Sequence, residues 1–457
     1  MFAASGIVPR GLSEVTHMTA PATTTDAPTL TPAGLKTSER GSRASMVQKV
    51  VSKGGIEAWL VEDYAVPLVA VEFAFKGGAS QDPAGKPGAA NLLAGLIDEG
   101  AGPYDAEAFH RALDEDAIEL SFSADRDILS GRLQTLSRNS SQAFSLLRLA
   151  VNEARLEAEP FERVLSQIAA GLKSEANEPD YVAGRTFREK AFPGHPYGLP
   201  VRGDLSALPT LTRGDLVELR GKIFARDTLK IAVVGAIDAA TLAGHLDDVF
   251  GPLPQASHIA PVADALLSGE GDRFVVDIDV PQSTIRFGRQ GLARMDPDFI
   301  ASMVVNHVLG GGVFSARLFR EVREKRGLAY SVYSQLITYD HGSMLYGGTS
   351  TKNERAAESM TVIAGEIASL SEQGPTEEEL EKAKKYLIGS YALRFDTSTK
   401  IASQLLHLQT DGFGVDYLDE RNRLIAAVTM EDAKRAAKRL FGDAKLLVAV
   451  AGRPEGM

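Results

Sequence analysis

Side chains that could bind a metal or act as nucleophiles are sparse in this chain. It has no cysteine, which excludes disulfides, iron–sulfur clusters, thiolate zinc sites and cysteine nucleophiles. It has eight histidines, but no two of them stand three or four residues apart, as a zinc-binding pair on one helix face would. We expect His195, in a Gly-His-Pro-Tyr sequence, to be a turn residue and His307 to pack in the core.

Motifs for two other kinds of chemistry are missing. The sequence contains neither the serine-hydrolase elbow Gly-x-Ser-x-Gly nor the nucleotide-binding loop Gly-x-x-x-x-Gly-Lys-Ser/Thr. The glycine run Gly310 to Gly312 follows a helical segment rather than a strand, so a nucleotide site is not predicted there. The charged run from Thr376 opens with a capping box and alternates charge at helical spacing, which is typical of a solvated helix face.

The most distinctive stretch of the sequence runs from Gly310 to Tyr330. Its three glycines end an apolar segment and allow the backbone to turn where a side chain would clash. Ser315 can then cap a helix that Gly327 ends, and a strand begins at Tyr330. The helix carries three arginines, Arg317, Arg320 and Arg323. From the residues alone, the stretch is a glycine turn, a basic helix and a strand.

Length and composition limit the class of protein. The chain has 457 residues, of which 44% are hydrophobic, enough for a large core in more than one domain. No apolar run is long enough to span a membrane, and the net charge of −11 argues against nucleic-acid binding. Residues 1–45 are predicted to be a disordered leader, part of which resembles a tag remnant, with Met18 as the natural start. We expect a cytoplasmic protein, with the periplasm as the alternative.

The chain contains an internal repeat. A Thr-x-x-Asp start, a phenylalanine and an apolar strand ending in glycine occur twice, 217 positions apart: at Thr212, Asp215, Phe224 and Gly235, and at Thr429, Asp432, Phe441 and Gly452. Near the starts of the two units, Val66-Pro67, Phe73 and Asn91 match Val280-Pro281, Phe287 and Asn306. The repeat predicts two homologous halves, residues 46–250 and 272–457, joined by a linker at 251–271.

Each half mixes strands and helices. In the first half we expect a strand pair at 57–61 and 68–75, a hairpin at 118–124 and 128–136, and a helix with an apolar stripe from Phe161 to Leu172. In the second half we expect strands at 274–280 and 284–290 and from Tyr330 and Leu345, and helices from Asp298, Glu354 and Thr376. The predicted fold class is α+β, with two α/β sandwich halves, each a mixed or antiparallel sheet covered by helices.

Three segments together resemble a known family. These are Gly-Ala-Ser-Gln-Asp-Pro-Ala-Gly-Lys-Pro-Gly at 78–88, Phe-Pro-Gly-His-Pro-Tyr-Gly at 192–198 and the stretch from Gly310 to Tyr330. From Val47 to its end the chain is similar to the pitrilysin/insulysin-type metallopeptidases, or inverted zincins. Among them it most resembles bacterial two-domain members related to mitochondrial processing peptidase.

The resemblance implies that the zinc motif has been lost. Active members carry His-x-x-Glu-His, whose histidines bind zinc and whose glutamate activates the zinc-bound water. Aligned on Gly88, these positions are occupied here by Asn91, Ala94 and Gly95. The third ligand, a glutamate, should lie within Val164 to Ile168, where no carboxylate occurs. No metal or other cofactor is therefore expected in this chain.

The resemblance also implies that substrate-contacting residues remain. In the family, an arginine and a tyrosine seven residues apart hold the substrate backbone and stabilise the oxyanion; here they are Arg323 and Tyr330. Further substrate contacts are expected from two groups of residues. They are the glycines Gly310, Gly311 and Gly312, and an edge strand made of Leu120, Ser121, Phe122, Ser123 and Ala124.

Taken together, these features predict the zinc-less subunit of a heterodimeric metallopeptidase. The expected partner is a homologous subunit that carries the zinc motif and zinc, and the expected substrate is a peptide or unfolded protein. Two alternatives remain open. One is a structural or peptide-binding protein that forms a homodimer, and the other is a self-sufficient zinc peptidase with an unrecognised metal site.

Overall fold

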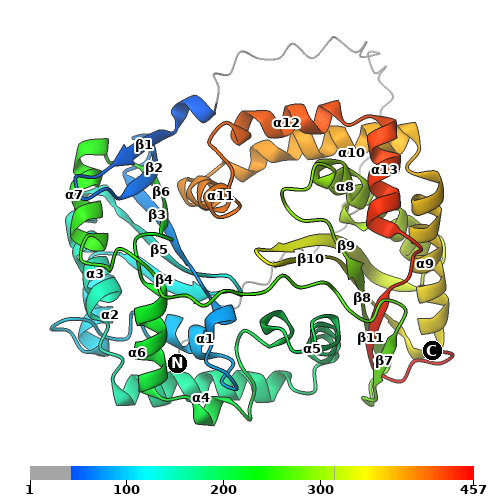
Figure 1. Cartoon of the computed structure of the whole chain (residues 1–457), viewed down its shortest axis with the longest axis horizontal. Coiled ribbons are helices and arrows are strands. Elements are labelled where there is room, and N and C mark those ends of the chain that lie inside the picture. Colours follow the sequence, from blue (N-terminus) through cyan, green and yellow to red (C-terminus); the bar gives the residue numbers. More distant parts are fainter. Residues whose placement is uncertain (1–42, 313) are drawn as a thin grey trace, which may run out of the picture. The chain divides into compact units, whose positions relative to one another are not determined.

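The computed structural model describes residues 43–312 and 314–457. Most of the predicted leader, 1–45, and Val313 of the glycine stretch lie outside the described residues. The described part contains two sheets, each with helices packed against it, as the α+β prediction required (Figure 1). No helix in this part of the chain is long and apolar enough to cross a membrane.

The first sheet has six strands in the order β1-β2-β6-β3-β5-β4. Their bounds are Gln48–Val51 (β1), Glu57–Glu62 (β2), Leu68–Lys76 (β3), Glu119–Ala124 (β4), Ile128–Leu136 (β5) and Lys230–Gly235 (β6). The predicted pairing of the second and third of these strands is wrong, because β6 lies between them, parallel to β2 and antiparallel to β3. Five of its six residues are buried, and a strand this apolar is best covered at the centre of a sheet. The predicted hairpin of β4 and β5 is confirmed.

The second sheet repeats this plan with five strands in the order β7-β11-β8-β10-β9. Their bounds are Arg273–Val276 (β7), Gln282–Gln290 (β8), Ala329–Tyr339 (β9), Gly342–Lys352 (β10) and Leu447–Ala451 (β11). The strand that closes the half, β11, is again inserted between the first two strands, parallel to β7 and antiparallel to β8. The two sheets therefore share one topology, apart from the extra edge strand β1. This matches the repeat seen in the sequence, and it makes β4 and β9 equivalent edge strands.

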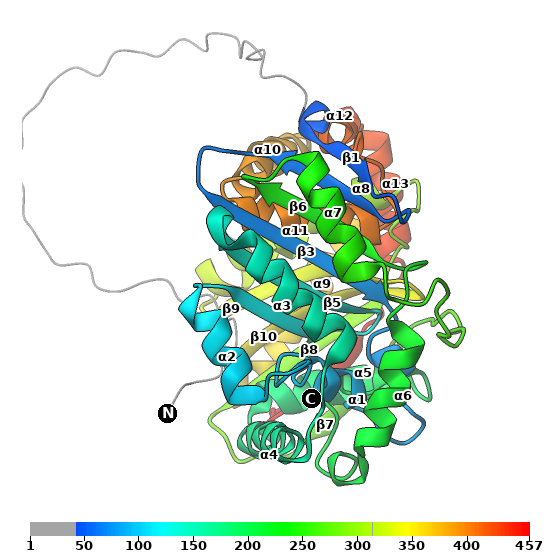
Figure 2. The same ribbon diagram turned by 90° about the vertical axis from the view of Figure 1, so that its left-hand side faces the viewer.

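Thirteen α-helices lie within the described residues. Those of the first half are Ala89–Ala94 (α1), Ala106–Glu115 (α2), Ser140–Glu153 (α3), Ala158–Glu175 (α4), Pro179–Ala191 (α5), Arg213–Ile223 (α6) and Ala239–Phe250 (α7). Those of the second half are Phe299–Asn306 (α8), Ala356–Gln373 (α9), Glu377–Gly389 (α10), Ser398–Thr410 (α11), Tyr417–Ala427 (α12) and Met430–Phe441 (α13). Capping boxes at Thr212, Thr376 and Thr429 start three of these helices, as predicted. In Figure 2, α3 and α7 lie across the outer side of the first sheet.

The two halves exchange one helix each. Helix α11, from the second half, packs on β3 and β6 of the first sheet, where Leu405 and Ala402 join a buried cluster with Trp59 and Val234. The Gln409 side-chain amide also donates a hydrogen bond of 2.9 Å to the Ile231 carbonyl oxygen. These contacts bury part of the first sheet under a helix that is far away in sequence (Figure 1).

The reverse contact comes from α5, which belongs to the first half and packs on β8 and β11 of the second sheet. Phe187 and Ala191 of α5 join a buried cluster with Met344, Tyr346 and Leu447. Phe187 and Tyr346 meet edge to face, with ring centroids 5.1 Å apart. The segment 251–271 runs between the halves and is bonded to both, through Gln81 on one side and Gln290 on the other.

The exchanged helix gives a first prediction. Leu405 is 1% exposed, so Leu405→Ala removes buried methyl groups at the contact between the halves. We expect it to lower the free energy of unfolding by about 2–5 kcal/mol, measured by urea denaturation. The control is Leu393→Ala, a 70% exposed leucine in the same half, for which a change within about 0.5 kcal/mol is expected. Equal effects of the two variants would contradict the packing described here.

Candidate functional site

The glycine turn places the end of α8 against strand β9. Helix α8 continues as a π-helical turn, η6 (His307–Gly311), whose backbone reaches Ser334. A methyl group at Gly310 would lie 2.6 Å from both the Ser334 backbone nitrogen and its Oγ. The Asn306 amide donates to the Ser334 carbonyl oxygen at 3.2 Å and accepts from Ser334 Oγ at 2.7 Å. A glycine is required here because backbone and strand approach this closely.

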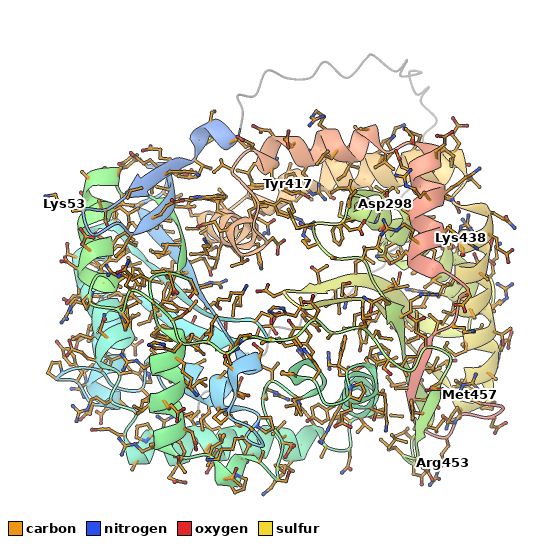
Figure 3. All side chains as sticks on the ribbon, in the orientation of Figure 1. Lys53, Asp298, Tyr417, Lys438, Arg453 and Met457 are labelled. Carbon is orange, nitrogen blue, oxygen red and sulfur yellow. The ribbon has the colours of Figure 1, made fainter. Side chains whose placement is uncertain are left out.

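Helix α8 itself is held by a buried carboxylate at its start. Asp298, labelled in Figure 3, accepts hydrogen bonds of 2.7 Å from Arg435 and from Arg439 of α13. Its side chain is only 6% exposed. This ion pair fixes the position of α8 on α13 and therefore the direction in which the glycine turn leaves it.

The predicted basic helix is present but partly π-helical, as η7 (Phe319–Glu324), and Gly327 follows it with φ of +58°. Its three arginines differ in their surroundings. Arg317 is buried and pairs with Glu379 at 2.6 Å, and Arg320 pairs with Glu321 at 3.3 Å. Arg323 makes no ion pair within the described residues. The structure therefore singles out Arg323 as the arginine that is free to meet a ligand.

Arg323 and Tyr330, the two residues that the family resemblance marks as substrate contacts, lie together in the structure. The Arg323 guanidinium carbon lies 4.4 Å from the centre of the Tyr330 ring and 4.7 Å from that of Phe319. Tyr330 is 79% exposed. In residues 43–312 and 314–457, no hydrogen bond or ion pair engages the Arg323 guanidinium or the Tyr330 hydroxyl. Both side chains can therefore donate to a ligand without first breaking a contact.

A cavity of about 660 Å³ adjoins this pair. Gly310, Gly311, Phe319, Arg323 and Tyr330 line it, together with β9 residues from Ser331 to Thr338. Two of the three predicted glycines thus belong to the site, whereas Gly312 packs against the buried His307 side chain. His307 lies in the core as predicted, its ring 4.8 Å from that of Tyr386. His195 is a turn residue, since its Nδ1 accepts from the Tyr197 backbone nitrogen.

The predicted substrate strand and the vacant zinc positions lie elsewhere, together in the first half. Strand β4, which includes Leu120 to Ala124, pairs with β5 and otherwise forms the edge of its sheet. Helix α1 packs beside it. A helix end thus lies beside an edge strand in each half: α1 beside β4, and η6 beside β9. The two arrangements occupy corresponding places in the internal repeat. Whether Leu120 to Ala124 bind substrate stays a prediction.

The residues at the zinc-motif positions do not fit a zinc ion. Asn91 is half-buried, Ala94 is buried, and a methyl group at Gly95 would lie 3.2 Å from Val164 Cγ1. Helix α4 thus passes beside these positions, where the family resemblance puts its third ligand, but it presents a valine. An amide, a methyl group and a valine offer no imidazole or carboxylate. Across the described residues, no group of three or more His, Cys, Asp or Glu side chains is placed to hold a metal ion.

Helix α1 keeps a defined start although its motif is gone. The Asp82 carboxylate accepts hydrogen bonds of 2.7 Å from the backbone nitrogens of Gly88 and Ala90. Burial raises the pKa of Asp82 to about 7, although these hydrogen bonds act in the opposite direction. Helix α1 is therefore held in place at its start, although the residues at its zinc-motif positions cannot bind zinc.

Sequence reasoning missed part of the cavity wall. Three more arginines line it, Arg294, Arg394 and Arg421, and so does Tyr417, labelled in Figure 3. They come from the loop before α8, the short helix η9 (Ser390–Arg394) and α12. Tyr417 and Arg421 stand one helical turn apart, which is the only local signal, and nothing in the sequence links them to Arg294.

The fold and the site indicate a peptidase-like protein without zinc ligands. Comparisons with known proteins agree with this class. Residues 210–387 match the family described as Peptidase M16 inactive domain. The chain is 25% identical over 356 residues to the non-peptidase homolog YmxG of Helicobacter pylori, covering 78% of this chain and 82% of that protein. It is 26% identical over 367 residues to an uncharacterized zinc protease of Mycobacterium tuberculosis, covering 80% and 84%.

Solved structures show the same relationship. A peptidase M16 inactive domain from Pseudomonas fluorescens has a TM-score of 0.84 and 26% identity, covering 89% of this chain and 98% of that one. A protease from Helicobacter pylori, 19% identical, shares the fold with a TM-score of 0.81, covering 89% and 99%. The chain is thus similar to M16 peptidase homologues, and its residues 210–387 match the inactive M16 domain. This confirms the family resemblance inferred from the motifs.

The vacant motif leads to a second prediction, on metal content. Because Asn91, Ala94 and Gly95 offer no zinc ligand set, the purified chain should contain far less than one equivalent of zinc. The measurement is metal analysis after dialysis against zinc and then against buffer. A homologue with the intact motif serves as the positive control. Near-stoichiometric zinc, with peptide cleavage that chelation abolishes, would instead support a self-sufficient peptidase.

A third prediction concerns Glu321, which anchors η7. Burial raises its pKa, but hydrogen bonds from Lys325, Arg326 and Arg320 outweigh burial and lower the pKa to about 2. Since the folded pKa lies below the model-compound value of 4.5, the carboxylate stabilises the fold above pH 4.5, and this contribution is lost as the pH falls toward 2.

Glu321→Gln should therefore lower the free energy of unfolding at pH 7 by about 2 kcal/mol, the usual contribution of hydrogen bonds to a charged group. The difference from the unsubstituted protein should narrow as the pH drops from 4.5 toward 2. Urea denaturation at several pH values measures it. Glu378→Gln, at an exposed pair with Lys382, is the control and should change little. A difference that does not depend on pH would contradict the electrostatic explanation.

Proposed function

We propose that this protein is the zinc-less subunit of a two-chain peptidase that acts on peptides or unfolded proteins. The partner is a homologous subunit that carries the zinc motif. This chain contributes Arg323 and Tyr330 to the shared site. The observation that carries the proposal is that a half-buried Arg323 stacks on an exposed Tyr330 and that neither side chain has a polar partner among the described residues. The zinc-motif positions of the same chain hold Asn91, Ala94 and Gly95.

The geometry of the pair suits contacts to a peptide carbonyl group. The guanidinium offers several N–H donors in a fixed plane, and the phenol adds one O–H donor beside it. Stacking on Phe319 and Tyr330 holds the guanidinium in place, so little side-chain entropy is lost when a ligand binds. Donors fixed in this way stabilise negative charge that develops on a carbonyl oxygen during peptide hydrolysis.

The assignment of this chain as a non-catalytic subunit rests on chemistry rather than on names. Restoring the zinc motif would require two substitutions in α1, one at Gly95 directly after it, and a carboxylate on α4, where Val164 fills the space next to Gly95. The names of the homologues, a non-peptidase homolog and an inactive M16 domain, are consistent with this view. The two-chain assembly and the role of Arg323 and Tyr330 are the proposed part.

A fourth prediction tests this function. The chain is mixed with a zinc-motif homologue, ideally one encoded beside it, and cleavage of a quenched fluorescent peptide is measured for each chain and for the pair. Cleavage should require the pair. Arg323→Ala should lower kcat/KM of the pair by about 100-fold or more, and Tyr330→Phe by about tenfold, because each removes a donor to the developing charge.

Two variants of the same chain serve as controls. Arg423→Ala, at an exposed arginine of α12 that pairs with Glu420, and Tyr386→Phe, beside His307, alter exposed side chains that do not line the cavity. Both should leave cleavage and assembly unchanged. Equal cleavage by the homologue alone and by the pair would reject the proposal. In that case, retention of peptide binding by a homodimer of this chain would favour the structural or peptide-binding alternative.

A further inference from the structure

The cavity beside β9 has a strongly positive lining. Four arginines, Arg294, Arg323, Arg394 and Arg421, face it, and none of its lining residues is aspartate or glutamate. The chain as a whole carries a net charge of −11, so this lining is opposite in sign to the protein's overall charge. A concave site with one sign of charge concentrates ligands of the other sign.

One of the four arginines, Arg421, is buried. Its side chain is 7% exposed, and its Nη1 donates to the Leu387 carbonyl oxygen at 3.2 Å and to Asn422 Oδ1 at 3.1 Å. Its guanidinium carbon lies 4.3 Å from the centre of the Tyr391 ring. No carboxylate of the described residues pairs with it. Burial lowers its pKa, and the nearby positive charge of Arg394 acts in the same direction.

Of the other arginines in the cavity, only Arg294 has a carboxylate partner among the described residues. Arg294 already has a partner, since its Nε lies 2.9 Å from the Asp411 carboxylate. Arg394 is exposed and, like Arg323, forms no ion pair within the described ranges. A buried guanidinium without a counter-ion is costly, and an anion that enters the cavity would remove that cost. The arrangement therefore favours a ligand that carries a carboxylate.

Strand β9 supplies the second part of a binding site. It pairs with β10 on one side, and the Ser334 carbonyl oxygen, which accepts from Asn306, faces the other side. At Ser334 this side is occupied by the Asn306 amide and by the closely packed backbone of Gly310. In an antiparallel pair the backbone groups of alternate residues point the same way, so those of Val332 and Leu336 face this side as well. In the part of the chain that the structure describes, no other backbone segment bonds to them. The backbone of a peptide in the cavity can pair with the groups of β9 that remain free on this side.

The internal repeat contains this arrangement twice. Strand β9 and η6 occupy the places in the second half that β4 and α1 occupy in the first. In the first half, the edge strand β4 lies beside α1. By the repeat, the same geometry, a strand edge beside the end of a helix, recurs at β9 with arginines around it.

We propose that the cavity beside β9 binds an extended acidic peptide segment, which pairs with the β9 edge while Arg394 and Arg421 hold one of its carboxylates. The inference rests on the proposed function only in taking the ligand to be a peptide. It concerns binding by this chain alone and needs no partner subunit. It adds a preference for acidic segments to whatever the zinc-bearing partner selects.

The test, our fifth prediction, is fluorescence anisotropy with the purified full chain and no partner. Four labelled peptides of one length are compared: an Asp/Glu-containing sequence and its Asn/Gln counterpart, each with a free or an amidated C-terminus. If the two Asp/Glu peptides bind more tightly, the cavity holds a side-chain carboxylate. If the two peptides with a free C-terminus bind more tightly, it holds the terminal carboxylate. Either preference should weaken as salt is added. Equal binding of all four, or no binding, would overturn the proposal.

Substitutions locate the site. Arg394→Gln should weaken binding of the preferred acidic peptide about tenfold, as expected for one lost charge-assisted hydrogen bond, and leave its uncharged counterpart unchanged. Arg423→Gln, an exposed arginine on α12 paired with Glu420 outside the cavity, is the matched control and should bind as before. Equal losses in both variants would show a general charge effect and reject the site.

Arg421→Gln tests the buried position. It should remove the acidic preference, while circular dichroism and the melting temperature confirm that the variant is folded. If Arg421→Gln does not fold, the result from Arg394→Gln decides. Because these measurements use the isolated chain, they stay informative when the mixed-chain cleavage assay fails, and cleavage by the pair without any acidic preference would reject this inference alone.

Discussion

The exchange of α5 and α11 between the two sheets is the contact on which the rest of the structure depends. Each sheet has part of one face covered by a helix from the other half, through the clusters around Leu405 and Phe187. Burial of this kind stabilises by roughly 1.5–3 kcal/mol for each large apolar side chain. Because the cover is reciprocal, neither sheet is complete without the other half. Within the second half, α8 contacts both β9 and α12 and so positions these two walls of the cavity.

Electrostatic contacts then decide which arginine is available. The basic helix brings three arginines close together, but Glu379 takes Arg317 and Glu321 takes Arg320, so that only Arg323 remains without a carboxylate among the described residues. Glu379 also ties the segment to α10, whereas Glu321 belongs to the segment and pairs within it. Structural ion pairs and a ligand-binding guanidinium therefore come from one short segment, and the position of each acid determines the role of each arginine.

Local features of the fold could be read from the sequence, and non-local ones could not. The capping box at Thr429 was predictable because the acceptor and donor are three residues apart. The apolar stripe of α4 and the glycine turn at Gly310 were equally local. The insertion of β6 between β2 and β3 was missed, because strand order depends on which face each strand must bury rather than on adjacency in the chain.

The same distinction applies to the site. Arg323 and Tyr330 were predictable because seven residues and a glycine turn bring them together, and because the family pattern marks the spacing. Arg394 and Arg421 lie in elements that meet β9 only after folding. Neither has a sequence neighbour that indicates a ligand, and a buried arginine without an acid is recognisable only once its surroundings are known.

The reciprocal helices also have a consequence for synthesis on the ribosome. The Gln409 amide and the Ile231 carbonyl oxygen that it reaches are 178 residues apart. While the chain is being translated, the first sheet can form its strands but must wait for α11, with Trp59 and Val234 uncovered in the meantime. Exposed apolar sheet surface at that stage promotes aggregation and binding by chaperones. The first half can therefore complete its fold only after α11 of the second half has been synthesised.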